Sequence, residues 1–325
     1  MKPFLSLSLA LILAATPCLA ETAPGIAHLQ DASVTERPLS LSIWYPSGDP
    51  ASATIGGNIV FEGVSAAPEA PFPGDARPLV VVSHGGLRSA ADSGAWLSSS
   101  MAQAGYVVVE VNVPRPDNAA NALTEIWQRP GDIRRAIDLV LADATWGPRI
   151  DEGRVAVAGF ALGATAALSV AGADMDVARY MRACAADGPT VGPDCGWYAA
   201  QGVDVSDTSE ERLEGLARDP RVSSVIALNP EYPAALGTAP ADVHALRISL
   251  GTPDAASGDA QVGHAVVIPE ATVFDAFPVC TAAGPDILAE DGGDPSICGV
   301  STAVRQSIHR QVSGAIISFL TRGAE

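Results

Sequence analysis

Short runs of consecutive apolar residues recur along the chain and alternate with longer stretches whose apolar residues repeat at helical spacing. A short continuous apolar run suits a strand buried on both faces of a sheet, whereas apolar positions three and four apart form one face of a helix. The strand-like runs lie at 41–45, 79–83, 106–112, 155–160, 222–228 and 246–250. The helical patterns lie at 95–104, 132–144, 161–171 and 302–321. This alternation predicts an α/β fold with a doubly wound, mostly parallel sheet.

Two stretches interrupt the alternation. Residues 56–76 contain several glycines and prolines and are predicted to form a loop. Residues 174–219 lie between two predicted strands and are interpreted as a lid-like excursion near the top of the sheet. Neither stretch has the character of a linker between domains, so we expect a single domain over residues 21–325.

The amino-terminal segment is typical of an export signal. Met1 and Lys2 precede an apolar run to about Ala15, and small residues follow up to Ala20. The run is short for a membrane span, so residues 1–20 are interpreted as a cleaved signal peptide of a secreted or periplasmic protein. An uncleaved anchor is the alternative. We expect no stable membrane insertion after cleavage.

The composition limits the partners of the chain. Of 325 residues 48% are hydrophobic, and 19 basic against 37 acidic residues give a formal charge of −18. Neutralising nucleic-acid phosphates requires clusters of Lys and Arg, which are missing from the sequence. The charge also argues against binding to anionic membranes.

Four cysteines follow the predicted signal peptide. An even number of cysteines in an exported chain indicates disulfides. Proximity in the sequence favours Cys184–Cys195 and Cys280–Cys298, which is one of three connectivities. A zinc site is the rival interpretation, but neither pair has the close spacing of zinc ligands. We therefore expect two disulfides, no metal and no cofactor.

The segment 155–164 predicts a sharp turn from a buried strand into a helix. Gly159 and Gly163 have the spacing of the nucleophile elbow, G-x-S-x-G, in which a serine lies at the tip of the turn. Here the tip residue is Ala161, whose methyl group cannot attack a carbonyl. An ordinary strand–turn–helix junction explains the glycine pair equally well, so the rest of the chain must decide.

A second glycine-containing segment, Ser83-His84-Gly85-Gly86, follows the buried run at 79–83. Together with the elbow it resembles the dienelactone-hydrolase-like proteins of the α/β-hydrolase superfamily, with an affinity to platelet-activating-factor acetylhydrolases. The resemblance runs from about Trp44 to Phe319 and implies an α/β-hydrolase fold with an oxyanion hole of backbone N–H groups. Its other motifs are Ile43-Trp44-Tyr45-Pro46, residues 127–133 and Ile150-Asp151. The oxyanion and ligand-binding positions that it implies are His84, Gly85, Gly86, Leu87 and Leu162.

The resemblance also implies where a catalytic triad would lie. Its members follow in the order serine, acid, histidine. Ala161 stands in the serine position, and the acid position falls on Asp254, with Asp259 second; either carboxylate also fits a solvated turn. In the segment 269–280, Val273 stands where the resemblance places the histidine.

The other candidates for nucleophile and base do not replace the missing groups. Thr165 and Ser169 are expected to point along the helix and away from the turn. His264 precedes a strand, on the side opposite the expected site. The histidines interpreted as structural or surface residues are His28, His84, His244 and His309.

These observations predict an exported protein of dienelactone-hydrolase type that is catalytically degenerate. It would bind a small ester or acyl ligand, or a protein partner, without turnover. The alternative is an active carboxylic-ester hydrolase, either with an unusual constellation or with a native serine changed to Ala161. A structural component without a ligand is the third interpretation.

Overall fold

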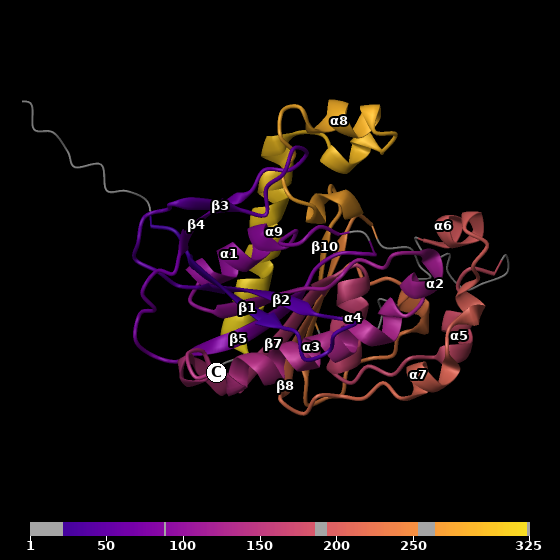
Figure 1. Cartoon of the computed structure of the whole chain (residues 1–325), viewed down its shortest axis with the longest axis horizontal. Helices are drawn as coiled ribbons and strands as arrows, with labels where there is room; N and C mark the ends of the chain where they lie inside the picture. Colours follow the sequence, from indigo (N-terminus) through magenta and orange to yellow (C-terminus); the bar gives the residue numbers. More distant parts are fainter. Residues whose placement is uncertain (1–21, 88, 186–193, 253–263, 324–325) are drawn as a thin grey trace, which may run out of the picture.

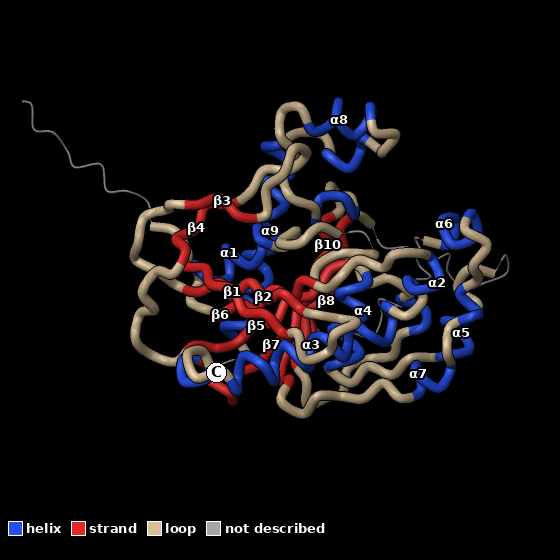
Figure 2. Tube along the Cα trace, in the orientation of Figure 1, coloured by secondary structure: helices blue, strands red, loops and turns tan. Residues whose placement is uncertain are grey.

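The structure is a computed structural model that describes residues 22–87, 89–185, 194–252 and 264–323. One ten-stranded sheet runs through the molecule in the order β10-β9-β8-β7-β5-β6-β2-β1-β4-β3 (Figures 1 and 2). The strands from β10 to β6 are parallel to their neighbours, and β2 and β1 extend the sheet in antiparallel pairing. The strands are β1 (Gly25–Asp31), β2 (Leu39–Tyr45), β3 (Ala53–Ile55), β4 (Val64–Pro68), β5 (Arg77–Ser83), β6 (Val107–Asn112), β7 (Ile150–Phe160), β8 (Val222–Leu228), β9 (His244–Leu250) and β10 (His264–Ile268).

Helices cover both faces of this sheet. The α-helices in the described residues are α1 (Ala95–Gln103), α2 (Ala119–Ala122), α3 (Glu125–Ala142), α4 (Leu162–Val170), α5 (Val177–Met181), α6 (Cys195–Ala200), α7 (Glu210–Glu214), α8 (Gly284–Glu290) and α9 (Thr302–Arg322). Short 3₁₀ turns are η1 (Gly147–Arg149), η2 (Val205–Asp207), η3 (Pro233–Ala235), η6 (Val273–Ala276) and η7 (Pro295–Cys298).

Two hydrophobic cores hold the three layers together. On one face, α3 and α4 pack their apolar residues, among them Ile133 and Ala164, against the sheet. On the other face, α1 and α9 contribute residues such as Trp96 and Ile316. The central strands are apolar on both sides because each strand residue faces one of the two cores. The mostly parallel doubly wound sheet predicted from the pattern is therefore confirmed.

Three of the differences between the prediction and the structure concern the sheet and its covering helix. The loop predicted at 56–76 contains β4, whose Ala66 is fully buried although glycine and proline surround the strand. The helix predicted from residue 132 begins at Glu125, so Pro130 lies inside it, as its sixth residue, and cannot donate to the carbonyl four residues earlier. Strand β1 was not predicted. It has no continuous apolar run, because the polar residues His28 and Gln30 alternate with apolar ones and are exposed.

Residues of the predicted excursion form α5, α6 and α7, which gather at one end of the molecule (right in Figure 1). Cys184 bonds to Cys195 within the excursion, and Cys280 bonds to Cys298 near α8, so both predicted disulfides are confirmed. Among the described residues, no helix combines the length and the apolar character that a bilayer span needs. The predicted signal peptide, residues 1–20, lies outside the described residues.

Candidate functional site

The strands β5, β7 and β8 end at one edge of the sheet, and the predicted elbow connects β7 to α4 at this edge. Ala161 has φ 55° and ψ −125°, which is outside the regions that L-residues favour. Its N–H donates to Leu228 O at 3.1 Å, and its carbonyl accepts from Glu231 N at 3.3 Å. Backbone hydrogen bonds to the end of β8 thus hold the strained turn without help from the side chain of residue 161.

The two glycines of the elbow are required by close backbone approach. A Cβ at Gly159 would lie 2.2 Å from Gly163 O, and a Cβ at Gly163 would lie 1.9 Å from Ser83 O. Both distances are far shorter than any contact between a real Cβ and an oxygen. The spacing that the sequence showed therefore reflects the packing of β7, α4 and β5 against one another.

Replacing Ala161 by glycine should stabilise the fold by about 1 kcal/mol. Strain of about 1–3 kcal/mol at such a backbone conformation is relieved, which outweighs the loss of one buried methyl and the greater freedom of unfolded glycine. Urea unfolding monitored by tryptophan fluorescence measures the difference. The matched variant Ala164→Gly, in the interior of α4, should instead lose about 1 kcal/mol or more. Equal losses for both variants would contradict strain at residue 161.

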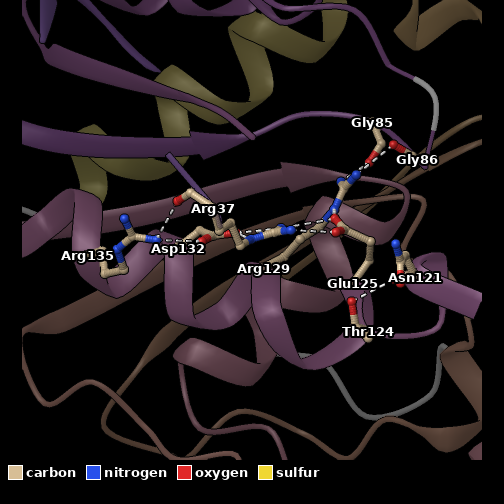
Figure 3. Close-up of polar contacts among 9 residues, drawn as sticks. All are labelled: Arg37, Gly85, Gly86, Asn121, Thr124, Glu125, Arg129, Asp132 and Arg135. Carbon is tan, nitrogen blue, oxygen red and sulfur yellow. Dashed lines mark hydrogen bonds and ion pairs between the residues drawn. The ribbon is translucent and has the colours of Figure 1, made fainter. Parts of the chain in front are cut away.

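The loop after β5 lies against the elbow. Gly85 N donates to Phe160 O at 3.1 Å, and Gly163 N donates to Gly85 O at 3.3 Å. Arg129 on α3 donates from Nη1 to Gly85 O at 2.7 Å and from Nη2 to Gly86 O at 2.8 Å (Figure 3). Because the C=O and N–H of a trans peptide point in opposite directions, Arg129 turns the N–H groups that follow these carbonyls away from α3.

Arg129 was not singled out as a functional residue from the sequence. The signal that could have found it is its place in the motif at 127–133, where a buried helix carries an arginine beside a proline. Only the fold shows that α3 runs past the loop containing Gly85 and Gly86 (Figure 3). We interpret Arg129 as a positioning residue of this loop.

A network of buried charges anchors Arg129. Its Nε donates to Glu125 Oε2 at 3.0 Å, and Arg37 donates to Glu125 Oε1 at 2.7 Å. Arg37 also contacts Asp132 at 2.7 Å, which in turn lies 3.4 Å from Arg135 (Figure 3). Glu125, Arg129 and Asp132 are each less than 5% exposed. The network therefore joins the segment before β2 to the helix that holds the loop.

Two buried histidines lie near this edge of the sheet, and both already have partners. His84 Nδ1 lies 3.1 Å from Ser93 Oγ, and its Nε2 lies 3.1 Å from Ala276 O. His309 Nε2 lies 3.1 Å from Phe277 O, and its ring stacks on Trp96 with centroids 3.8 Å apart. Burial lowers the pKa of both imidazoles to about 4, so both are neutral at pH 7.

These hydrogen bonds hold residues 276–278, which follow β10, against the core. Trp96 Nε1 also donates to Ala276 O at 3.0 Å, and Arg305 Nη1 donates to Pro278 O at 2.9 Å. Three successive carbonyls, from residue 276 to residue 278, thus accept from side chains of the core. Val273, at the start of the same segment, is 41% exposed and opens η6.

The other histidines lie elsewhere. His244 and His264 are the first residues of β9 and β10, at the edge opposite the elbow, because these strands are parallel to β7. His28 lies on the exposed side of β1, 3.4 Å from Ser42 Oγ. The imidazoles of the chain are therefore placed in structural or surface positions.

Of the remaining predicted site residues, some lie outside the described part of the chain and others belong to α4. Asp254 and Asp259 lie outside the described residues. The Thr165 hydroxyl donates to Glu231 O at 2.6 Å, and Ser169 is buried within α4. Among the described residues, no group of three or more His, Cys, Asp or Glu side chains is arranged to hold a metal ion.

Glu231 is a second residue of the site that the sequence did not reveal. It follows β8 at the elbow edge, and a Cβ on Gly86 would lie 3.3 Å from its Oε1. Burial raises its pKa to about 8, the charge of Asp194 adds to the shift, and a hydrogen bond from Leu162 N–H opposes it. No motif signalled Glu231, because only the fold brings the end of β8 beside the loop after β5.

Four titratable groups whose pKa values folding shifts predict a stability maximum between pH 4.5 and 6.5. Folding raises the pKa of Glu110 and Glu231 from 4.5 to about 8 through burial, and lowers that of His84 and His309 from 6.5 to about 4. Between pH 6.5 and 8 only the folded carboxyls retain protons, so stability falls as pH rises. Below pH 4.5 only the unfolded imidazoles gain protons relative to the fold, so stability falls with acid. Between these limits the two effects oppose each other.

Urea unfolding at pH 4 to 8.5 checks this profile. Each carboxyl should contribute up to about 1.4 kcal/mol per pH unit on the alkaline side. Glu110→Gln should reduce the alkaline decline by half, because it removes one of the two carboxyls that titrate there. The amide oxygen can still accept from Gly94 N–H, which lies 2.7 Å from Oε1 in the parent. A flat profile from pH 6.5 to 8 in the parent protein would contradict the assignment.

The comparisons with known proteins bear on the fold. The chain matches no protein-family model and no curated protein. Among solved structures it is similar to a ferulic acid esterase from Streptomyces cinnamoneus, with a TM-score of 0.55 and 18% identity, covering 95% of this chain and 92% of that one. A candidate carboxylesterase from Lactobacillus plantarum aligns at a TM-score of 0.40 and 12% identity, covering 83% of this chain and 98% of that chain, which is too distant to carry an argument.

Proposed function

From its α/β-hydrolase fold and the geometry of its elbow, we propose that this chain is an exported, catalytically degenerate protein of dienelactone-hydrolase type. It holds a small ester or acyl ligand at the elbow without hydrolysing it. The observation that carries the proposal is Ala161 at the strained tip of the turn, where a hydrolase of this fold has its nucleophilic serine. A scaffold that keeps the turn and lacks the hydroxyl can position an acyl group but cannot acylate itself.

The described imidazoles support the absence of turnover. A serine at position 161 would need a base within hydrogen-bond reach. His84 lies beside the elbow, with its ring 5.1 Å from that of Phe160, but Ser93 and Ala276 occupy both of its nitrogens. The fastened carbonyls of residues 276–278 keep the segment after β10 in a structural role.

Export is part of the same proposal. The two disulfides are of the kind that forms and persists in oxidising compartments. Together with the signal-like residues 1–20 they favour a secreted or periplasmic location for the mature chain.

Hydrolysis of 4-nitrophenyl esters tests the proposal. We expect the parent protein and the Ala161→Ser variant to release 4-nitrophenolate no faster than buffer. The double variant Ala161→Ser, Val273→His should be about 100-fold faster or more, because position 273 is where the resemblance places the catalytic base. Release is followed by absorbance at pH 7.5.

The matched control is Ala161→Ser combined with Val304→His, which places an imidazole at another exposed valine. It should remain inactive. Hydrolysis by the parent protein would establish the active-enzyme alternative instead. Activity of Ala161→Ser alone would show that only the hydroxyl is missing and that Val273 is not the histidine position.

A further inference from the structure

Glu231 places a carboxyl group where the oxyanion of a hydrolase would lie. The donors of that site, implied by the resemblance and the fold, are the N–H of Leu162 and those of the loop at Gly86 and Leu87. The Leu162 N–H lowers the pKa of the Glu231 carboxyl, and a Cβ on Gly86 would lie 3.3 Å from Oε1 of that carboxyl. The side chain therefore lies between the two backbone segments of the oxyanion hole.

The backbone of Glu231 is fixed in this place. Its N–H donates to Ala161 O at 3.3 Å, and its carbonyl accepts from the Thr165 hydroxyl at 2.6 Å. One carboxyl oxygen, Oε2, is buried and has no hydrogen-bond partner among the described residues. An unpaired buried carboxyl oxygen is costly, which points to a partner that binds there.

The surroundings determine which ligand group fits. Tyr180, Tyr198 and Tyr232 are buried, and the charge of Glu231 is among the causes that, after burial, raise the pKa of each. The positive charge of Arg129 on α3 lowers the pKa of the Glu231 carboxyl, and the negative charge of Asp194 before α6 raises it. This apolar, ring-lined setting favours the neutral form of the carboxyl at pH 7.

We propose that the carboxyl of Glu231 is the group that recognises the acyl ligand, by donating a hydrogen bond to its carbonyl oxygen in place of the Leu162 N–H. A neutral carboxyl has one accepting oxygen and one O–H donor. The accepting oxygen takes the Leu162 N–H, and the O–H is left for the ligand. Because the terminal torsion of glutamate is soft and the residue is partly exposed, either oxygen can face the ligand. This inference rests on the proposed function.

Two probes that differ only in the carbonyl test the inference. Binding of 4-nitrophenyl butyrate and of its ether, 4-nitrophenyl butyl ether, is measured by calorimetry at pH 6 and pH 9.5. The parent protein should prefer the ester about tenfold at pH 6, the effect of one hydrogen bond. At pH 9.5 Glu231 is ionised, so this preference should disappear.

Two variants separate the effect of the carboxyl from that of its surroundings. Glu231→Gln keeps an N–H donor that does not titrate, so the ester preference should persist at both pH values. Glu231→Leu lacks the titrating donor and leaves the backbone N–H groups uncovered, so any ester preference that it shows should be the same at both pH values. Circular dichroism checks that each variant is folded, and the isosteric glutamine variant keeps the test valid if the leucine variant is not.

The outcomes distinguish the two proposals. An ester preference that does not change with pH in the parent, or that changes with pH in Glu231→Leu as it does in the parent, overturns the role of Glu231 and leaves ligand binding intact. Release of 4-nitrophenolate by the parent overturns the absence of turnover alone. If neither probe binds the parent, both proposals are overturned.

Discussion

Gly163→Ala is expected to abolish folding or to destabilise the protein by more than about 4 kcal/mol. The added Cβ would lie 1.9 Å from Ser83 O and 2.6 Å from Ser83 C, and both atoms belong to the backbone of the central strand β5. The clash can be relieved only if α4 moves away from the sheet, which opens the core beneath it. Soluble yield and the urea midpoint measure the effect.

Gly314→Ala is the matched control, because Gly314 also lies inside a helix but has no atom within 4 Å of its added Cβ. On helix propensity alone this variant should be stabilised by up to about 1 kcal/mol. If the two variants had similar stability, the close approach of α4 to β5 would be wrong.

Arg37→Met should cost about 3–5 kcal/mol. Arg37 bridges Glu125 and Asp132, whose carboxylates are 1% and 3% exposed, and its loss leaves negative charge buried with fewer cations. The remaining pairing, from Arg129 and Arg135, is made at longer distances of 3.0 and 3.4 Å. Thermal and urea unfolding measure the loss.

The same substitution at a surface ion pair provides the comparison. Arg154 contacts Asp151 at 2.6 Å, but both side chains are more than a third exposed. Arg154→Met should change the free energy of unfolding by less than about 1 kcal/mol. A cost for Arg37→Met as small as that for Arg154→Met would show that the buried network does not stabilise the fold.

The central part of the fold could be predicted from the sequence because its strands are buried on both sides. The runs at 79–83 and 155–160 are apolar without interruption, and such runs have few alternatives to a parallel sheet. The edge of the sheet was less predictable. Strand β4 lies among glycines and prolines, and it is recognisable as a strand only through its pairing with β1 and β3.

The candidate site divides in the same way. The elbow and its glycines are local features of the sequence, so Gly159, Ala161 and Gly163 could be found there. Glu231 and Arg129 act on this site from distant segments. No local pattern marks Glu231, and the motif at 127–133 contains Arg129 without showing what it contacts. Their roles follow from the order of the strands and from the path of α3, which the sequence does not state.

The backbone hydrogen bonds of the elbow have a consequence for protein engineering. Because Leu228 and Glu231 hold residue 161 through main-chain atoms alone, the display of that position does not depend on which side chain it carries. The backbone at the end of β7 is thus held in place whichever side chain residue 161 has. A side chain introduced at residue 161 would thus leave the backbone in the same direction, into the nearly closed surroundings in which Ala161 is 7% exposed.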